Sequence, residues 1–165
     1  MAGSMVYNIV PGAIQTTNAS ALTTNDCLFF AAGAVTPTRN VGLLSFWPGG
    51  RGAGLSLTSG ISYRLEKWTT TAASGGTGIT PAPSDIGFQA AKHTSGYAVA
   101  TVTGGTGGPT LLLSILSGAT GPTAYVAPNP AAMHILQGWS GQSIDVFCVS
   151  GTISLSFEQS LQTVE

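Results

Sequence analysis

Short apolar runs separated by glycine, proline and small polar residues are the feature that most restricts how this chain can fold. The 165 residues include 23 glycines and nine prolines, which lie between the apolar runs and do not replace them. No window longer than ten residues keeps an apolar stripe at helical spacing without meeting Gly or Pro, so long helices are not expected. Apolar runs bounded by turn residues predict the strands of an all-β sandwich or barrel.

Ten runs have the length and the flanking turn residues of strands. They cover residues 5–10, 27–32, 41–47, 61–69, 97–103, 111–116, 124–127, 134–136, 143–149 and 152–157. In the fourth run Tyr63 and Leu65 share one face, while Arg64 and Glu66 share the other. This alternation predicts a strand with one buried face and one solvent face.

The local signals also predict turns, short helices and domain limits. Residues 143–149 and 152–158 flank Ser150-Gly151, which suggests a two-residue hairpin. Short helical turns are expected after Ser84 and after Asn129. Residues 26–165 read as one antiparallel β-sandwich of the jelly-roll kind with long Gly/Thr-rich loops, and residues 1–25 as an N-terminal arm or an edge strand.

Charged residues are unusually scarce. They make up 7% of the chain, against about 25% in a typical soluble domain, and the formal net charge is −1. None occurs before Asp26 or between Lys92 and Asp145. Low charge leaves a surface open to association, so this uncharged half predicts a subunit or partner interface. Five scattered cations give no basic patch, and nucleic acid is not an expected partner.

Neither a membrane nor a secretory route is indicated. The longest apolar run, Leu111–Leu116, is far shorter than the ~20 residues of a spanning helix. The N-terminus lacks the basic region of a signal peptide, so we expect the mature protein to be the whole chain. Cys27 and Cys148 have no metal-ligand spacing and are expected to be small buried hydrophobic residues in strands.

No motif predicts catalysis, a cofactor or a metal. The Gly-rich segments at 74–81 and 104–110 contain no lysine and precede no helix, which argues against phosphate loops. No carboxylate flanks His93 or His134, so we expect a loop histidine and a half-buried histidine at a strand end. The six carboxylates are dispersed, which disfavours a glycosidase pair or a calcium site. The prediction is therefore a protein that is not an enzyme.

Three tryptophans are the candidate ligand or interface residues. Trp47, Trp68 and Trp139 each lie near a predicted loop. Exposed aromatic faces stack well on sugar rings, although tryptophans in such positions more often cap a sandwich core or lie in an interface.

The segment Ile61–Pro83 carries a family resemblance. It contains the strand Tyr63-Arg64-Leu65-Glu66-Lys67, then a Thr/Ser-rich run, then Gly-Gly-Thr-Gly-Ile-Thr-Pro at 75–81. This pattern resembles small virion structural proteins of tailed bacteriophages, which have a β-sandwich body and long Gly/Thr/Ala loops. The resemblance implies a head decoration (cement) protein in the virion that binds the major capsid protein as an oligomer, commonly a trimer. It implies no catalytic residues.

Two other functions stay open at this stage. A tail or fibre module that binds carbohydrate or a receptor would use Trp47, Trp68 or Trp139. A small coat protein would form a shell by itself, although the chain lacks the basic segment expected for packaging nucleic acid.

Overall fold

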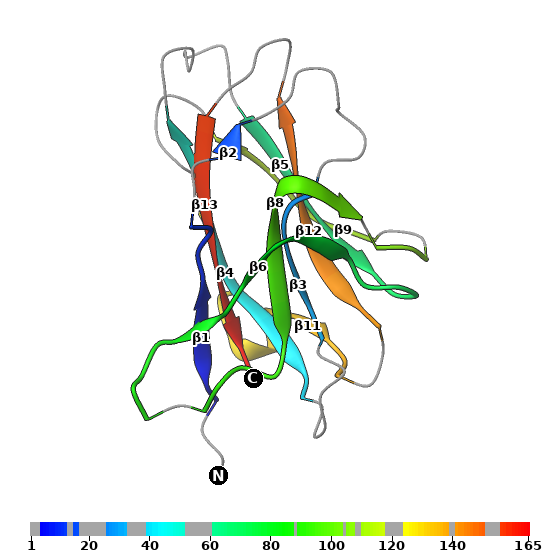
Figure 1. The fold of residues 1–165 in the computed structure, drawn as a ribbon. Helices are drawn as coiled ribbons and strands as arrows, with labels where there is room; N and C mark the ends of the chain where they lie inside the picture. Colours follow the sequence, from blue (N-terminus) through cyan, green and yellow to red (C-terminus); the bar gives the residue numbers. More distant parts are fainter. Residues whose placement is uncertain are drawn as a thin grey trace.

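Two antiparallel β-sheets pack face to face in the computed structural model (Figure 1), which confirms the all-β sandwich. The structure describes residues 4–12, 15–16, 26–32, 39–51, 61–87, 89–103, 105–107, 110–117, 124–138, 141–150 and 156–165.

Sheet A has seven strands and contains both the first and the last strand of the chain. From edge to edge its main path is β10 (Tyr125–Val126), β4 (Val41–Arg51), β13 (Ser156–Val164), β1 (Val6–Ile9) and β7 (Ala82–Pro83). Two short strands complete it, since β11 (His134–Leu136) pairs with β4 and β2 (Gln15–Thr16) pairs with β13.

Sheet B has six strands, and it includes the two long strands of the uncharged segment between Lys92 and Asp145. In spatial order it runs β6 (Ser74–Ile79), β8 (Thr94–Thr103), β3 (Asp26–Ala31), β12 (Ser143–Ser150), β5 (Ile61–Trp68) and β9 (Thr110–Ser117). Cys27 and Cys148 lie in β3 and β12, as expected for strand residues.

The core fills the space between the inner faces of the two sheets. Side chains from sheet A, such as Ile9, Phe46 and Leu161, meet side chains from sheet B, such as Phe30 and Leu65, and all of them are fully buried. Phe46 and Tyr63 contact edge to face across this layer, with ring centroids 5.5 Å apart. Tyr63 and Leu65 face this core while Arg64 is exposed, as the alternation of apolar and charged residues predicted.

The main strands pair in a nested order. The first strand, β1, pairs with the last, β13, and β3 pairs with β12. Inside these pairs, β4 pairs with β10 and β11, and β5 pairs with β9. The chain thus crosses repeatedly from one sheet to the other.

The predicted hairpin at Ser150-Gly151 is wrong. β12 lies between β3 and β5 in sheet B, while β13 lies between β4 and β1 in sheet A. The two strands are joined by a connection between sheets, and residues 151–155 lie outside the described part of the chain. A short Ser-Gly segment can form a hairpin within one sheet or a connection between two sheets, so the local sequence could not distinguish the two.

The two predicted helical turns had different outcomes. Pro130–Ala132 form a 3₁₀ helix, in which the Ala132 amide donates to the carbonyl of Asn129 at 3.0 Å and to its side chain at 3.1 Å. The described residues after Ser84 form a turn without a helix, in which the Gly87 amide donates to the Asp85 carboxylate.

The first 25 residues are partly built into sheet A. β1 lies between β13 and β7, and β2 pairs with β13 further along. Residues 17–25 lie outside the described part of the chain.

Candidate binding surface

The structure places Trp47 and Trp68, two of the three candidate tryptophans, in different sheets. Trp47 projects from β4 on the outer face of sheet A and is 48% exposed. Trp68, at the end of β5, is half-buried in sheet B. Trp139 lies outside the described residues. Trp47 and Trp68 therefore belong to different sheets and cannot form a common platform.

A chain of side-chain hydrogen bonds crosses the outer face of sheet A next to Trp47. The indole Nε1–H of Trp47 donates to Ser45 Oγ at 2.9 Å, and Ser45 donates to Gln162 Oε1 at 2.9 Å. The Gln162 amide donates to Asn8 Oδ1 at 3.0 Å, and the Asn8 amide donates to Ser84 Oγ at 3.1 Å. Every donor points in the same direction, an arrangement in which successive hydrogen bonds polarise one another.

Strand register places this chain of hydrogen bonds in one row. Ser45 on β4 is opposite Gln162 on β13, and Gln162 is opposite Asn8 on β1. The neighbouring residues Phe46, Leu161 and Ile9 are fully buried, so alternation directs the hydrogen-bonded side chains outward.

Exposed apolar side chains lie beside the row. Val126 on β10 is opposite Ser45 and is 53% exposed, and Val10 after β1 is 58% exposed. None of these outward residues is charged. We refer to them as the sheet A platform, which consists of Asn8, Val10, Ser45, Trp47, Ser84, Val126 and Gln162.

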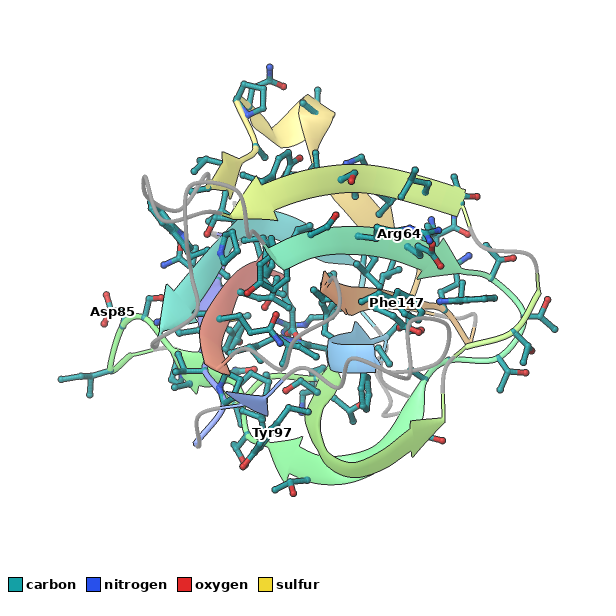
Figure 2. All side chains as sticks on the ribbon, turned by 90° about the horizontal axis from the view of Figure 1, so that it is seen from above. Arg64, Asp85, Tyr97 and Phe147 are labelled. Carbon is teal, nitrogen blue, oxygen red and sulfur yellow. The ribbon has the colours of Figure 1, made fainter. Side chains whose placement is uncertain are left out.

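The outer face of sheet B carries the charges that the platform lacks. Arg64 on β5 forms an ion pair with Glu66, and Arg64 lies beside Phe147 on the adjacent strand β12 (Figure 2). Glu66 is opposite Asp145 on β12, and both residues are buried. The structure therefore brings together two carboxylates that appeared dispersed along the chain, and Glu66 is not on a solvent face.

A Thr-rich segment, residues 69–73, and part of the second Gly-rich segment, residues 105–107, cover this part of sheet B. Thr71 and Thr106 form a β-bridge, and the Gly105 amide donates to Asp145 Oδ2 at 3.1 Å. Ala73 packs with Phe29 and Ala31 in a second, smaller hydrophobic cluster. We call residues 69–73 and 105–107 the flap.

Neither Gly-rich segment forms a phosphate loop at the head of a helix. Ser74–Ile79 form the edge strand β6, and the flap amide of Gly105 is already bound to a carboxylate. Gly105 allows close packing, because a Cβ there would lie 2.5 Å from Trp68 Cβ.

A buried polar network closes one end of the sandwich. Nδ1 of His93 lies 2.7 Å from Glu165 Oε1, and Nε2 of His93 lies 3.0 Å from Thr163 Oγ1. The amides of Lys92 and His93 also donate to Glu165 Oε1, at 2.7 and 3.1 Å. The His93 ring meets Tyr7 edge to face, with centroids 5.5 Å apart. A carboxylate therefore does orient His93, contrary to the expectation from neighbouring sequence.

Electrostatics in this network favour the ionised form of Glu165. Burial acts to raise the pKa of the Glu165 carboxyl, but the hydrogen bonds from His93 and from the Lys92 amide outweigh it, and the pKa falls below its ordinary value. Because a carboxylate only accepts, the Nδ1–H of His93 donates to it. The pKa of the Tyr7 hydroxyl is raised, because burial and the nearby Glu165 carboxylate outweigh the opposite effect of the Arg39 guanidinium.

The connectivity of Thr163, His93 and Glu165 is that of a hydroxyl, a base and an orienting carboxylate. Thr163 is fully buried, and the side chains of His93 and Glu165 are both 0% exposed. In this arrangement the Thr163 hydroxyl has no contact with solvent, so it offers no surface to a substrate. The network instead joins the two sheets.

His134 occupies the half-buried strand-end position that was predicted for it. It begins β11 and stacks on Tyr125, with ring centroids 5.9 Å apart. Burial lowers its pKa, and the nearby Lys67 ammonium lowers it further.

The described residues contain no group of three His, Cys, Asp or Glu side chains that could hold a metal ion. The described part of the chain also contains no helix with the length and apolar character needed to cross a membrane.

Comparison of the chain with known proteins finds no matching family model, no matching curated protein and no matching solved structure.

Proposed function

We propose that this protein is a non-enzymatic structural protein of a phage virion, which binds the outer surface of the head as a decoration (cement) protein and stabilises it. The observation that carries the proposal is the sheet A platform, whose seven residues carry no charge and include one prominent, half-exposed tryptophan. The resemblance of Ile61–Pro83 to small phage virion proteins points to the same class.

The platform has the chemistry of a protein-binding surface. Tryptophan is enriched among the residues that contribute most to protein interfaces, while the central parts of such interfaces are poor in charge. Trp47 is 48% exposed, and its indole is held by Ser45. Side chains that are already ordered before binding lose less conformational entropy on association. The hydrogen bonds from Trp47 to Ser84 therefore favour a rigid contact.

The nested strand order supports a sandwich of the jelly-roll kind. In a jelly roll an antiparallel ribbon is wrapped into two sheets, so that the first strand lies beside the last and the second beside the one before it. The pairs β1–β13 and β3–β12, with β4 and β5 paired inside them, follow that order. Viral capsid proteins and lectins both use this architecture, so the fold alone does not select between them.

Co-sedimentation with capsids tests the proposal. The probe is a panel of expanded, DNA-free shells of tailed phages, incubated with wild type and with Trp47→Ala. We expect saturable binding of wild type to at least one shell, a higher temperature of shell disruption, and at least about tenfold weaker binding of Trp47→Ala. Ile86→Ala is the matched control, because Ile86 is fully exposed on a loop outside the platform. Absence of binding to every shell, or equal losses in both variants, overturns the proposal.

A second candidate, a carbohydrate-binding module of a tail or fibre, is favoured by the row of hydrogen bonds that connects Trp47 through Ser45 to the amides of Gln162 and Asn8. Aromatic faces stack on sugar rings, and amides bond their hydroxyl groups. Titration with bacterial surface glycans should then quench tryptophan fluorescence in wild type but not in Trp47→Ala. An unchanged spectrum across the panel contradicts this candidate.

A further inference from the structure

The edges of the two sheets differ in how well they resist pairing with another chain. Sheet A ends on one side in the two-residue strand β7, which contains Pro83, and on the other in β10 and β11, of two and three residues. In sheet B, β6 has Gly75 and Gly76 at positive φ, and its register with β8 shifts there. Short strands, proline and irregular register are devices by which sheets avoid edge-to-edge association.

Strand β9 lacks most of these devices. It has eight residues, with no charge and no proline, and it forms the other end of sheet B (Figure 1). Among the described residues its only strand partner is β5. A bulge at Leu112 leaves Leu113–Ser117 in unbroken register with β5. Leu111 is 54% exposed, and Ser114 is also exposed.

We propose that β9 is a self-association site, at which a second copy of this chain adds its own β9 in antiparallel orientation and extends sheet B across two protomers. The backbone groups of a free edge are satisfied by another extended strand. A partner strand with charged side chains is disfavoured, because those side chains would lose hydration beside the leucines of β9 and would find no opposite charge on β9. β9 itself is an uncharged strand of suitable length, and it lies in the uncharged segment between Lys92 and Asp145.

The alternation of side chains restricts the register of this pairing. Antiparallel pairing of two β9 strands relates them by a twofold axis. The core-facing residues of both strands lie on the same side of the extended sheet only if this axis passes between two copies of the same residue. An axis at Ser114 places Leu113 opposite Ile115 of the second copy on the core side, and Ser114 opposite its own equivalent on the outer side. Leu113 packs against the hydrophobic core, and Ile115 is 6% exposed, so the core layer continues across the pair.

This inference does not rest on the capsid-binding proposal. A β9 pair has twofold symmetry, which differs from the trimer implied by the family resemblance. Binding to shells and self-association are measured separately, so either can fail without the other.

Charge substitutions at the axis test the pairing. Ser114→Lys and Ser114→Glu each place like charges opposite one another, whereas a mixture of the two variants places opposite charges there. We expect wild type to dimerise in sedimentation velocity, each variant alone to dissociate with at least about tenfold higher Kd, and the mixture to form heterodimers. Thr110→Lys and Thr110→Glu are the matched controls, because Thr110 is also exposed on β9 but lies away from the axis.

Disulfide trapping tests the register independently. Ser114→Cys should form a covalent dimer at least about tenfold faster than Thr110→Cys, since the two copies of residue 110 would lie about 25 Å apart along the strands. Wild type, which contains Cys27 and Cys148, sets the background. A monomeric wild type, a dimer unaffected by either Ser114 substitution, or equal trapping at both positions overturns the proposal.

Discussion

Nδ1 of His93 and Oε1 of Glu165 lie 2.7 Å apart although 72 positions separate the two residues along the chain. His93 directly precedes β8 of sheet B, and Glu165 directly follows β13 of sheet A. With Thr163 on the other nitrogen of the imidazole, the contact joins the two sheets at one end of the sandwich. This end is therefore held by polar interactions, whose strength depends on protonation.

Replacement of Glu165 by Gln should remove a pH-dependent part of the stability. The pKa of Glu165 is lowered in the folded protein, so its carboxylate stabilises the fold above the ordinary value of 4.5, and that contribution is lost as the pH falls below it. Urea unfolding measured from about pH 7 to about pH 3 should show a steeper acid loss in wild type than in Glu165→Gln.

Asp85→Asn is the control for this experiment, because Asp85 is exposed on a loop and bonds only the local Gly87 amide among the contacts described. It should leave the acid limb of the stability curve unchanged. Parallel curves for wild type and Glu165→Gln would contradict the assignment.

Thr163→Val should destabilise the fold by about 1–3 kcal/mol, the cost of leaving a buried polar group without its hydrogen bond. The affected group is Nε2 of His93, which lies 3.0 Å from the Thr163 hydroxyl. Thr163→Ser keeps the hydroxyl and should lose less. Chemical denaturation of both variants checks the prediction, and equal losses in Val and Ser would show that the hydroxyl contributes nothing.

Gly105→Ala should disrupt the flap. The new methyl group would lie 2.5 Å from Cβ and Cγ of Trp68 and 2.9 Å from the Thr71 carbonyl oxygen. Forced packing of this kind costs about 1–3 kcal/mol, and the displacement should change the near-UV circular dichroism of Trp68. Gly78→Ala is the matched control, since no heavy atom lies within 4 Å of its added methyl group. A Gly105→Ala protein as stable as Gly78→Ala would contradict the close packing of the flap.

Lys67→Met should raise the pKa of His134 in the folded protein. Burial is the larger cause of the lowered pKa and remains in the variant, but the Lys67 ammonium is the other cause and is removed. An NMR titration of the His134 ring protons measures the shift. Lys92→Met removes the same charge elsewhere and should leave the His134 titration in place, so equal shifts in the two variants would exclude a specific effect of Lys67.

Most of the strands were predictable because their apolar residues also form the core. Runs such as Val41–Trp47 combine β-forming residues with flanking turn residues, and each reappears as a strand. β6 was missed because Ser-Gly-Gly-Thr-Gly-Ile has no strand propensity of its own, and its pairing with β8 places it in the sheet. The run predicted at 152–157 meets β13 only at residues 156 and 157, because residues 152–155 lie outside the described part of the chain. The rest of β13, residues 158–164, was missed because it is rich in polar residues such as Gln162 and Thr163.

Long-range contacts explain what the sequence could not predict about the surface. Trp47 was identified, but its link through Ser45 and Gln162 to Asn8 depends on three strands that lie far apart in the sequence. The proximity of Glu66 and Asp145 depends in the same way on the register of β5 and β12. No local pattern encodes either relationship.

The pairing of β1 with β13 also has a consequence for how the protein is made. β1 is synthesised long before β13, yet β13 is its main neighbour in the sheet, because its other neighbour, β7, contributes only two residues. Domains dominated by such distant pairings fold slowly, because loop closure must precede the contacts that stabilise it. Sheet A therefore remains incomplete until β13 has been made, and β1 is without its main partner strand until then.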